Sequence, residues 1–269
     1  MRRLAVLFSV LCLTAAATGV LTSAPAGAAP GETTIYLANA FSFAGGHPFG
    51  GTFCIDGAIV GNAATEEVTG PVTIASGDHL AQFFDSSVGD CTSTANGSFD
   101  GTFPASSVTL MAYWGDAGQA LALLDNPLDC VAAGAGRLTV RNGSGFGDPS
   151  DVDIYGDGPG GTGQLLLSGI ESGDQGTVDL PVGSYTNVVA VAAGGTPPDD
   201  TVVDLGSINV VANSGAYAYL YGGNDGDVGS FLGNPAELNA CAVATTLAPT
   251  TTAPPAAAAA VQATPAFTG

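Results

Sequence analysis

The sequence contains no lysine and only two histidines, and its basic residues are four arginines. Two of them, Arg2 and Arg3, open a segment that we expect to be removed. The remainder has two arginines against 24 acidic residues, a formal charge of −22. Such a surface repels phosphate groups, which excludes nucleic acid and anionic membranes as partners. Solubility at a cell exterior explains the charge, while calcium ions or cationic surfaces stay open as partners.

Residues that serve catalysis are equally scarce. The histidines, His47 and His79, are not accompanied by a Gly-x-Ser-x-Gly elbow or by closely spaced zinc ligands. Carboxylate pairs for glycoside cleavage give no signal, because among 24 acids any pair can be chosen. We therefore expect no catalytic residue, no cofactor and no enzymatic activity. A secreted hydrolase that uses carboxylates is the alternative from another class.

The two ends of the chain have biased compositions. After the two arginines, residues 4–21 are uncharged and mostly apolar, and Ala-rich cleavage frames follow, which predicts a signal peptide over residues 1–29. No later apolar run reaches the ~20 residues of a membrane span. Residues 245–269 are rich in Thr, Pro and Ala and predict a disordered, stalk-like tail. The protein is expected to be secreted or displayed at a cell surface.

Comparison of the chain with itself reveals a repeat, which indicates two domains over residues 30–131 and 132–244. Five blocks recur in the same order at offsets of about 100–110 residues. Tyr113 falls opposite Leu220 in this match, and Cys130 opposite Cys241. The other matched blocks are residues 34–39 with 137–142, 53–57 with 152–156, 70–79 with 176–185, and 124–127 with 232–235.

Each block alternates apolar and polar residues, as in a strand with one buried face, and Gly, Asp, Asn and Pro separate the strands. With 40 glycines and no helical period outside the signal peptide, the fold class is all-β. We expect two tandem, antiparallel, Greek-key or immunoglobulin-like β-sandwiches.

A tyrosine corner supports this type of sandwich. In the second repeat Leu180, Gly183 and Tyr185 have its Leu-x-x-Gly-x-Tyr spacing, in which the glycine turns the chain and the tyrosine hydroxyl bonds back to the backbone. The first repeat has Gly77 and His79 at the matching places. Because an imidazole can also donate to a carbonyl, a structural role is expected for His79.

The second repeat resembles the bacterial extracellular family known as domain of unknown function 4397. The resemblance rests on the hydrophobic-Asp-hydrophobic-Tyr pattern of residues 152–155 and the Pro-x-Gly-x-Tyr pattern of residues 181–185. It covers residues 136–241 well and 32–130 loosely, where Cys54 replaces the aspartate and His79 the tyrosine. It implies export, a β-sandwich and tandem copies, and it carries no established activity.

Three further groups of residues have two interpretations each. Asp and Asn clusters could bind calcium, although turn chemistry explains them as well. Arg137 and Arg141 share one strand face, where they could grip a carboxylate ligand or form outward ion pairs. Trp114 could stack on a sugar, but its match to Tyr221 suggests a packing role. The clusters comprise Asp148, Asp151, Asp153 and Asp157, and residues 224–227.

Disulfides are predicted from the four cysteines outside the signal peptide, an even number in an exported chain. Four cysteines allow three pairings. Cys54 and Cys91 occur only in the first repeat, so we pair them with each other. Cys130 and Cys241 are equivalent positions that close the two repeats, so we pair them across the domain boundary.

The function expected from these observations is that of a non-catalytic structural, adhesive or ligand-binding protein. A cell-envelope component, a glycan or a protein could be the ligand, and a calcium-assisted carbohydrate-binding module is the runner-up.

Overall fold

The computed structural model describes residues 31–41, 50–85, 90–115, 118–145, 151–222, 228–233, 236–238 and 240–241. The signal peptide, the tail, His47, Asp148 and residues 224–227 lie outside these ranges. No helix among the described residues has the length and apolar character needed to cross a membrane.

Strands account for the fold, and they form four sheets. Repeat 1 contains β1 (Glu32–Ala40), β2 (Gly51–Ile55), β3 (Ala58–Ala63), β4 (Glu67–Ala75), β5 (Gly77–Asp85), β6 (Gly97–Phe103), β7 (Ser107–Gly115) and β8 (Gly118–Asp125). Repeat 2 contains β9 (Ala135–Gly143), β10 (Val152–Gly158), β11 (Gly161–Ile170), β12 (Gln175–Pro181), β13 (Gly183–Ala192), β14 (Thr201–Val210), β15 (Ser214–Gly222), β16 (Val228–Leu232) and β17 (Ala236–Glu237).

The two repeats have the same topology. Repeat 1 pairs its strands in the orders β4-β1-β7-β8 and β3-β2-β5-β6, and repeat 2 in the orders β12-β9-β15-β16 and β11-β10-β13-β14, with β17 beside β15. Each strand of repeat 1 therefore corresponds to the strand eight places later. The chain crosses between the two sheets of a repeat several times, as in Greek-key sandwiches.

Side-chain hydrogen bonds recur with the strands. Asn39 near the end of β1 donates from Nδ2 to the carbonyl of Ala63 at 3.2 Å. Asn142, its equivalent in β9, donates to the carbonyl of Ile170 at 3.0 Å. Both asparagines are buried, so the same amide ties the two sheets of each sandwich together.

One block of the sequence match is displaced by one residue. Tyr113 pairs with Ala40 and Tyr221 pairs with Gly143, and Ala40 and Gly143 are equivalent. Tyr113 therefore corresponds to Tyr221 and not to Leu220. Such a slip is hard to detect in β7 and β15 because both strands are apolar at successive positions.

The expectation of antiparallel pairing throughout was wrong for two strand pairs. β7 pairs in parallel with β1, and β15 in parallel with β9, while the other ladders between the named strands are antiparallel. β7 reaches β1 only after the chain has passed through the opposite sheet. Alternation of apolar residues records which face is buried but not the direction in which the strand runs.

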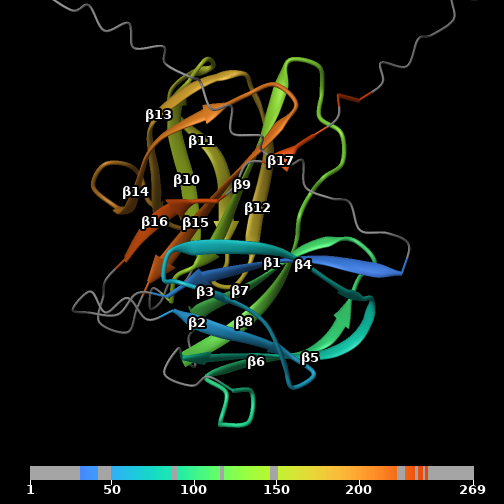
Figure 1. Cartoon of the computed structure of the whole chain (residues 1–269). Helices are drawn as coiled ribbons and strands as arrows, with labels where there is room; N and C mark the ends of the chain where they lie inside the picture. Colours follow the sequence, from blue (N-terminus) through green and yellow to red (C-terminus); the bar gives the residue numbers. More distant parts are fainter. Residues whose placement is uncertain are drawn as a thin grey trace, which may run out of the picture.

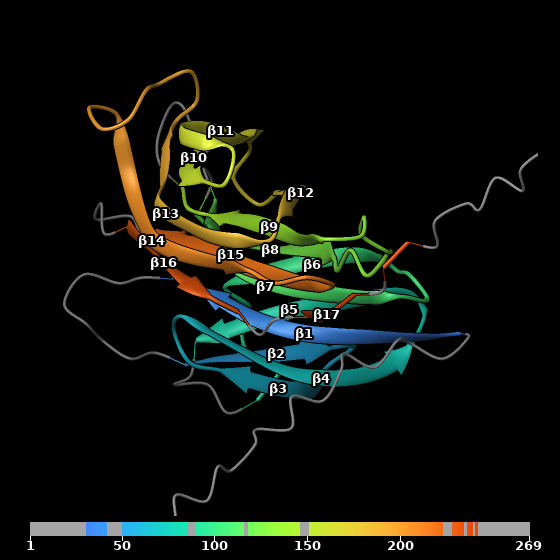
Figure 2. The same cartoon turned by 90° about the horizontal axis from the view of Figure 1, so that it is seen from above.

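The sandwiches stack through one sheet of each repeat (Figures 1 and 2). β1 contacts β15, β9 contacts β7, and β7 and β15 contact each other, which is the reciprocal pattern of a two-fold interface. The sheets that contain β1 and β9 are therefore covered on both faces, and almost every residue of these two strands is buried. Each sandwich also has its own core, and a third apolar cluster spans the interface.

Candidate functional site: the interface between the repeats

Small and aromatic side chains build the apolar part of the interface. Repeat 1 contributes mostly small or flexible side chains, among them Ala38, Ala40 and Met111. Repeat 2 contributes the rings of Tyr217 and Tyr219, both less than a tenth exposed. The large rings of repeat 2 thus lie against mostly small or flexible side chains of repeat 1, which allows dense packing.

Arg141 lies at the centre of this interface and is 1% exposed. Its Nη1 donates to the hydroxyls of Thr109 and Tyr219, each at 2.6 Å. Its Nη2 donates to the carbonyl of Asp125 at 3.0 Å and to Asn126 Oδ1 at 2.6 Å. Thr109, Asp125 and Asn126 belong to repeat 1, so one side chain of repeat 2 binds three residues of its neighbour.

The partners of this guanidinium are neutral. Its Nε donates to Gln175 Oε1 at 3.0 Å, and its Cζ lies 4.8 Å from the ring centre of Tyr217 and 5.3 Å from that of Tyr219. Cation–π contacts of this kind stabilise the guanidinium, which burial has separated from its hydration water. Burial raises the pKa of Tyr217 to about 12, so this phenol stays neutral even above the ordinary tyrosine pKa of 10.

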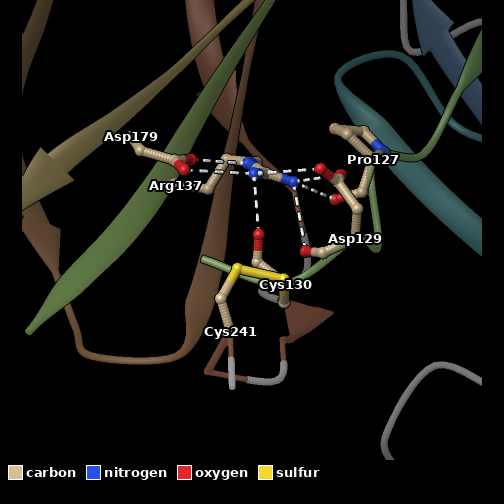
Figure 3. The surroundings of a disulfide bond; sticks show 6 residues. All are labelled: Pro127, Asp129, Cys130, Arg137, Asp179 and Cys241. Atoms are coloured by element: carbon tan, nitrogen blue, oxygen red, sulfur yellow. Dashed lines mark hydrogen bonds and ion pairs between the residues drawn. A yellow bond between two sulfur atoms is a disulfide. The ribbon is translucent and has the colours of Figure 1, made fainter. Parts of the chain in front are cut away.

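Arg137 holds the boundary between the repeats with charged partners (Figure 3). Its Nε and Nη2 donate to the two carboxylate oxygens of Asp179 at 2.7 and 3.2 Å. Its Nη1 forms an ion pair with Asp129 and donates to the carbonyl of Pro127 at 3.1 Å. The hydrogen bonds to Asp179 above all raise the pKa of Arg137. Asp179 is on β12, whereas Pro127 and Asp129 lie on the segment that leaves repeat 1.

The two arginines therefore share one face, as predicted, but that face is not exposed. Arg137 forms the expected ion pairs with acidic residues, Asp129 and Asp179, although its own side chain is buried. For Arg141 the expectation was wrong, because repeat 1 covers this side chain and the hydrogen-bond partners described for it are neutral. The same cover leaves no room for a carboxylate ligand at Arg141.

The predicted disulfides are present. Cys130 and Cys241 are joined across the boundary, with Cα atoms 4.8 Å apart. The amide of Cys241 donates to the carbonyl of Val131 at 2.8 Å, and Arg137 Nη2 donates to the carbonyl of Cys130 at 3.4 Å (Figure 3). The disulfide, the side chain of Arg137 and the backbone hydrogen bond of Cys241 thus all connect the two repeats at the same place.

The second bridge joins Cys54 of β2 to Cys91, with Cα atoms 6.0 Å apart. Phe53 packs into the core of repeat 1, so Cys54, next to it in the strand, faces the opposite side of the sheet. Cys54 is nevertheless fully buried. Phe84 is fully buried too, and it faces the same side of the sheet, because its neighbour Phe83 packs into the core. The bridge holds the segment around Cys91 against this otherwise outward face.

The tyrosine corner of repeat 2 and the matching corner of repeat 1 form the same hydrogen bond with different side chains. The hydroxyl of Tyr185 donates to the carbonyl of Pro181, four residues earlier, at 3.1 Å. His79 Nε2 makes the equivalent bond to the carbonyl of Ala75 at 2.9 Å. Gly77, two residues before His79, has φ +138°, a conformation that L side chains rarely adopt.

His79 also binds a carboxylate. Its Nδ1 lies 2.6 Å from Asp56 Oδ2, and the amide of Leu80 donates to Asp56 Oδ1 at 3.0 Å. The hydrogen bond to Asp56 raises the pKa of His79, and the same bond lowers the pKa of Asp56. Both ring nitrogens face acceptors, so the imidazolium, with two N–H donors, satisfies both bonds.

Two carboxylates of the calcium hypothesis, those of Asp153 and Asp157, accept hydrogen bonds from backbone amides. Asp153 is 7% exposed and accepts from the amides of Gly169 and Gly194 at 2.8 and 2.9 Å. Asp157 accepts from the amide of Gly163 at 2.6 Å and from Asn187 Nδ2 at 2.7 Å. Among the described residues, no group of three or more His, Cys, Asp or Glu side chains is arranged to hold a metal ion.

Aromatic rings that could stack on a sugar are not fully exposed in the described ranges either. Each aromatic side chain in the described ranges is buried or partly buried. Trp114 packs edge-on against Phe41, with ring centres 6.4 Å apart, which supports the packing interpretation, although its equivalent is Gly222 and not Tyr221.

The interface between the repeats was not predicted from the sequence. The signal that could have revealed it is in β7, where residues 108–114 are almost continuously apolar, as in strands buried on both faces. In β15, Tyr217 and Tyr219 alternate with Ala218 and Leu220, so that both faces are apolar.

No family model and no curated protein matches the chain. Several solved structures resemble it, among them two with low TM-scores. One is titled "The Bacillus anthracis TIE protein", with 11% identity over 71% of this chain and 33% of that chain and a TM-score of 0.22. The other is titled "Alpha-glucan recognition by family 41 carbohydrate-binding modules from streptococcal virulence factors", with 8% identity, 74% and 96% coverage and a TM-score of 0.25. The chain spans about one third of the first protein, and neither likeness carries an argument about function.

Proposed function

We propose that this chain is an exported, non-catalytic module that acts as a rigid structural or ligand-binding unit outside the cell. One observation carries the proposal: the cationic side chains that the structure describes all serve the fold. Arg137 and Arg141 fasten the two repeats together, and His79 closes a strand corner. The disulfides fit an oxidising, extracellular environment.

Export and family are part of the proposal. The signal peptide over residues 1–29 and membership in the family of domain of unknown function 4397 rest on the sequence patterns. The repeated sandwich and the corner at Tyr185 are compatible with both. N-terminal sequencing of protein recovered from culture medium tests export, and an N-terminus near residue 30 is expected.

The non-catalytic role is tested on the purified mature chain. Assayed against panels of chromogenic glycosides and esters, the chain should give rates equal to those of the heat-denatured protein. Turnover abolished by one Asp→Asn substitution would contradict the proposal. Asp157→Asn is an informative variant for this purpose, because the Asp157 carboxylate is partly exposed and fixed by two hydrogen bonds.

Calcium-assisted carbohydrate binding is the alternative, and it needs a ring or a cation site that a sugar can reach. Glycan arrays with and without Ca²⁺, together with calorimetric titration of Ca²⁺, decide between the two. Calcium-dependent binding to one class of glycan would replace the structural role as the primary function.

A further inference from the structure

The bridge between Cys130 and Cys241 changes the covalent path through the molecule. It joins two residues separated by 111 positions, and strands β9 to β17 all lie between them. The shortest covalent route from β8 to the residues after Cys241 therefore crosses the two sulfur atoms. The strands of repeat 2 form a closed side loop on that route.

Contacts next to the bridge strengthen this junction, although Arg137 also ties it to β9 and β12 of repeat 2 through its own position and through Asp179. Arg137 binds Asp129 and the carbonyls of Pro127 and Cys130, which lie just before the bridge in the chain (Figure 3). A parallel β-bridge pairs Val131 with Ala240, one residue inside each cysteine.

We propose that this disulfide is a tension bypass. A pull between repeat 1 and the chain beyond Cys241 passes through the sulfur–sulfur bond, so repeat 2 stays folded under loads that unfold repeat 1. The Thr/Pro/Ala-rich composition of residues 245–269, typical of a linker, gives such a pull a point of application. The inference goes beyond the proposed function and requires no ligand.

Repeat 1 lies in the path of the load and should therefore unfold before repeat 2. The load enters at the start of β1 and leaves at the end of β8. Thr34 pairs with Ser107, and Asp125 pairs with Val108, so both load points lie at the same end of one sheet. A pull between them separates the β1–β7 and β7–β8 ladders one hydrogen bond at a time. The bridge from Cys54 to Cys91, 37 positions apart, limits how far repeat 1 can extend.

Single-molecule force spectroscopy on the mature chain, with handles at its N-terminus and in the tail, tests the bypass. The oxidised protein should release only the residues of repeat 1 outside its own disulfide loop. At roughly 3.5 Å per residue, a loop of 111 positions hides about 390 Å of chain. Because its Cα atoms are 4.8 Å apart when folded, nearly all of this length should appear once the bridge is absent.

The matched variants are C130S/C241S and C54S/C91S. The first should add about 390 Å, and the second only about 130 Å, the length of 37 positions at roughly 3.5 Å each. Full extension of the oxidised wild type, or no added length in C130S/C241S, would overturn the proposal.

Reduction provides a second test that does not depend on the folding of a variant. Cys130 is exposed, whereas Cys54 is fully buried. A mild reductant applied to the folded wild-type protein before it is loaded should therefore cleave the bridge between Cys130 and Cys241 first, so that the longer segment appears first on extension. Release of the shorter segment alone would contradict this assignment.

Discussion

Replacement of Arg141 by methionine tests whether the interface depends on this buried guanidinium. Methionine keeps an unbranched apolar stem beside Tyr217 but removes all five hydrogen bonds of the arginine. The carbonyl of Asp125 retains Gln175 Nε2 as a donor, at 2.9 Å, and the amide of Asn126 keeps its bond to Ser107. The oxygen of Asn126 keeps only the hydroxyl of Thr109.

The magnitude follows from these partners. A hydrogen bond to a charged group contributes about 1.5–3 kcal/mol, and R141M removes two such bonds to acceptors of repeat 1, the carbonyl of Asp125 and the side-chain oxygen of Asn126. Removing the cation also removes its own desolvation cost, which offsets part of the loss. We expect the free energy of unfolding of R141M to fall by about 3 kcal/mol, within the range for broken buried networks.

Guanidinium unfolding of the mature chain, followed by circular dichroism, measures the change. T162M, at an exposed position on β11, is the matched control and should stay within about 0.5 kcal/mol of the wild type. A double-mutant cycle with N126A should give a coupling energy of about 0.5–3 kcal/mol. An R141M protein as stable as the control, or additive changes in the cycle, would refute the reasoning.

Three further predictions concern the disulfide and the corners. C130S/C241S should lose about 5 kcal/mol in a denaturant titration, since its loop spans 111 positions, and a loss below that of C54S/C91S would contradict the loop-entropy argument. His79 has a raised pKa, so its contribution is complete below the unfolded value of 6.5 and is lost as pH rises through the folded value. Asp56 has a lowered pKa, so its contribution is complete above 3.8 and is lost as pH falls through its folded value. The melting temperature of the wild type relative to H79Y should therefore decrease between pH 6 and pH 9, and a constant difference would exclude the imidazolium. Y185F should lose about 1 kcal/mol through the missing bond to Pro181, without the pH dependence seen at His79, and an unchanged stability would show that this bond contributes nothing.

Local features of the sequence predicted the strands, the repeat, the corner at Tyr185 and both disulfides. Alternation, turn residues and matched cysteines are all encoded within short segments or by equivalence between the repeats. The substitution of His79 for the tyrosine could be interpreted because imidazole and phenol can each donate to the same carbonyl.

The interface could not be predicted in the same way. Alternation shows that Arg137 and Arg141 share a face of β9, but it does not show whether another sheet covers that face. A polar residue in a strand is normally assigned to solvent. The cover comes from a separate sandwich, repeat 1, and from partners such as the carbonyl of Asp125 that have no signature in the sequence.

The reciprocal contacts of β1 with β15 and β7 with β9 resemble those of a symmetric dimer whose two subunits are fused into one polypeptide. In a dimer of identical subunits, any side chain placed on the shared face appears twice, and an arginine at its centre would meet a second copy of itself. Fusion of the two copies removes this restriction. Position 141 can carry a guanidinium while its equivalent, Ala38, carries a methyl group, so one half supplies the donor and the other the space and the acceptors. Such an interface is specific to the pairing of unlike halves, and two second repeats could not replace the present pair without burying two like charges together.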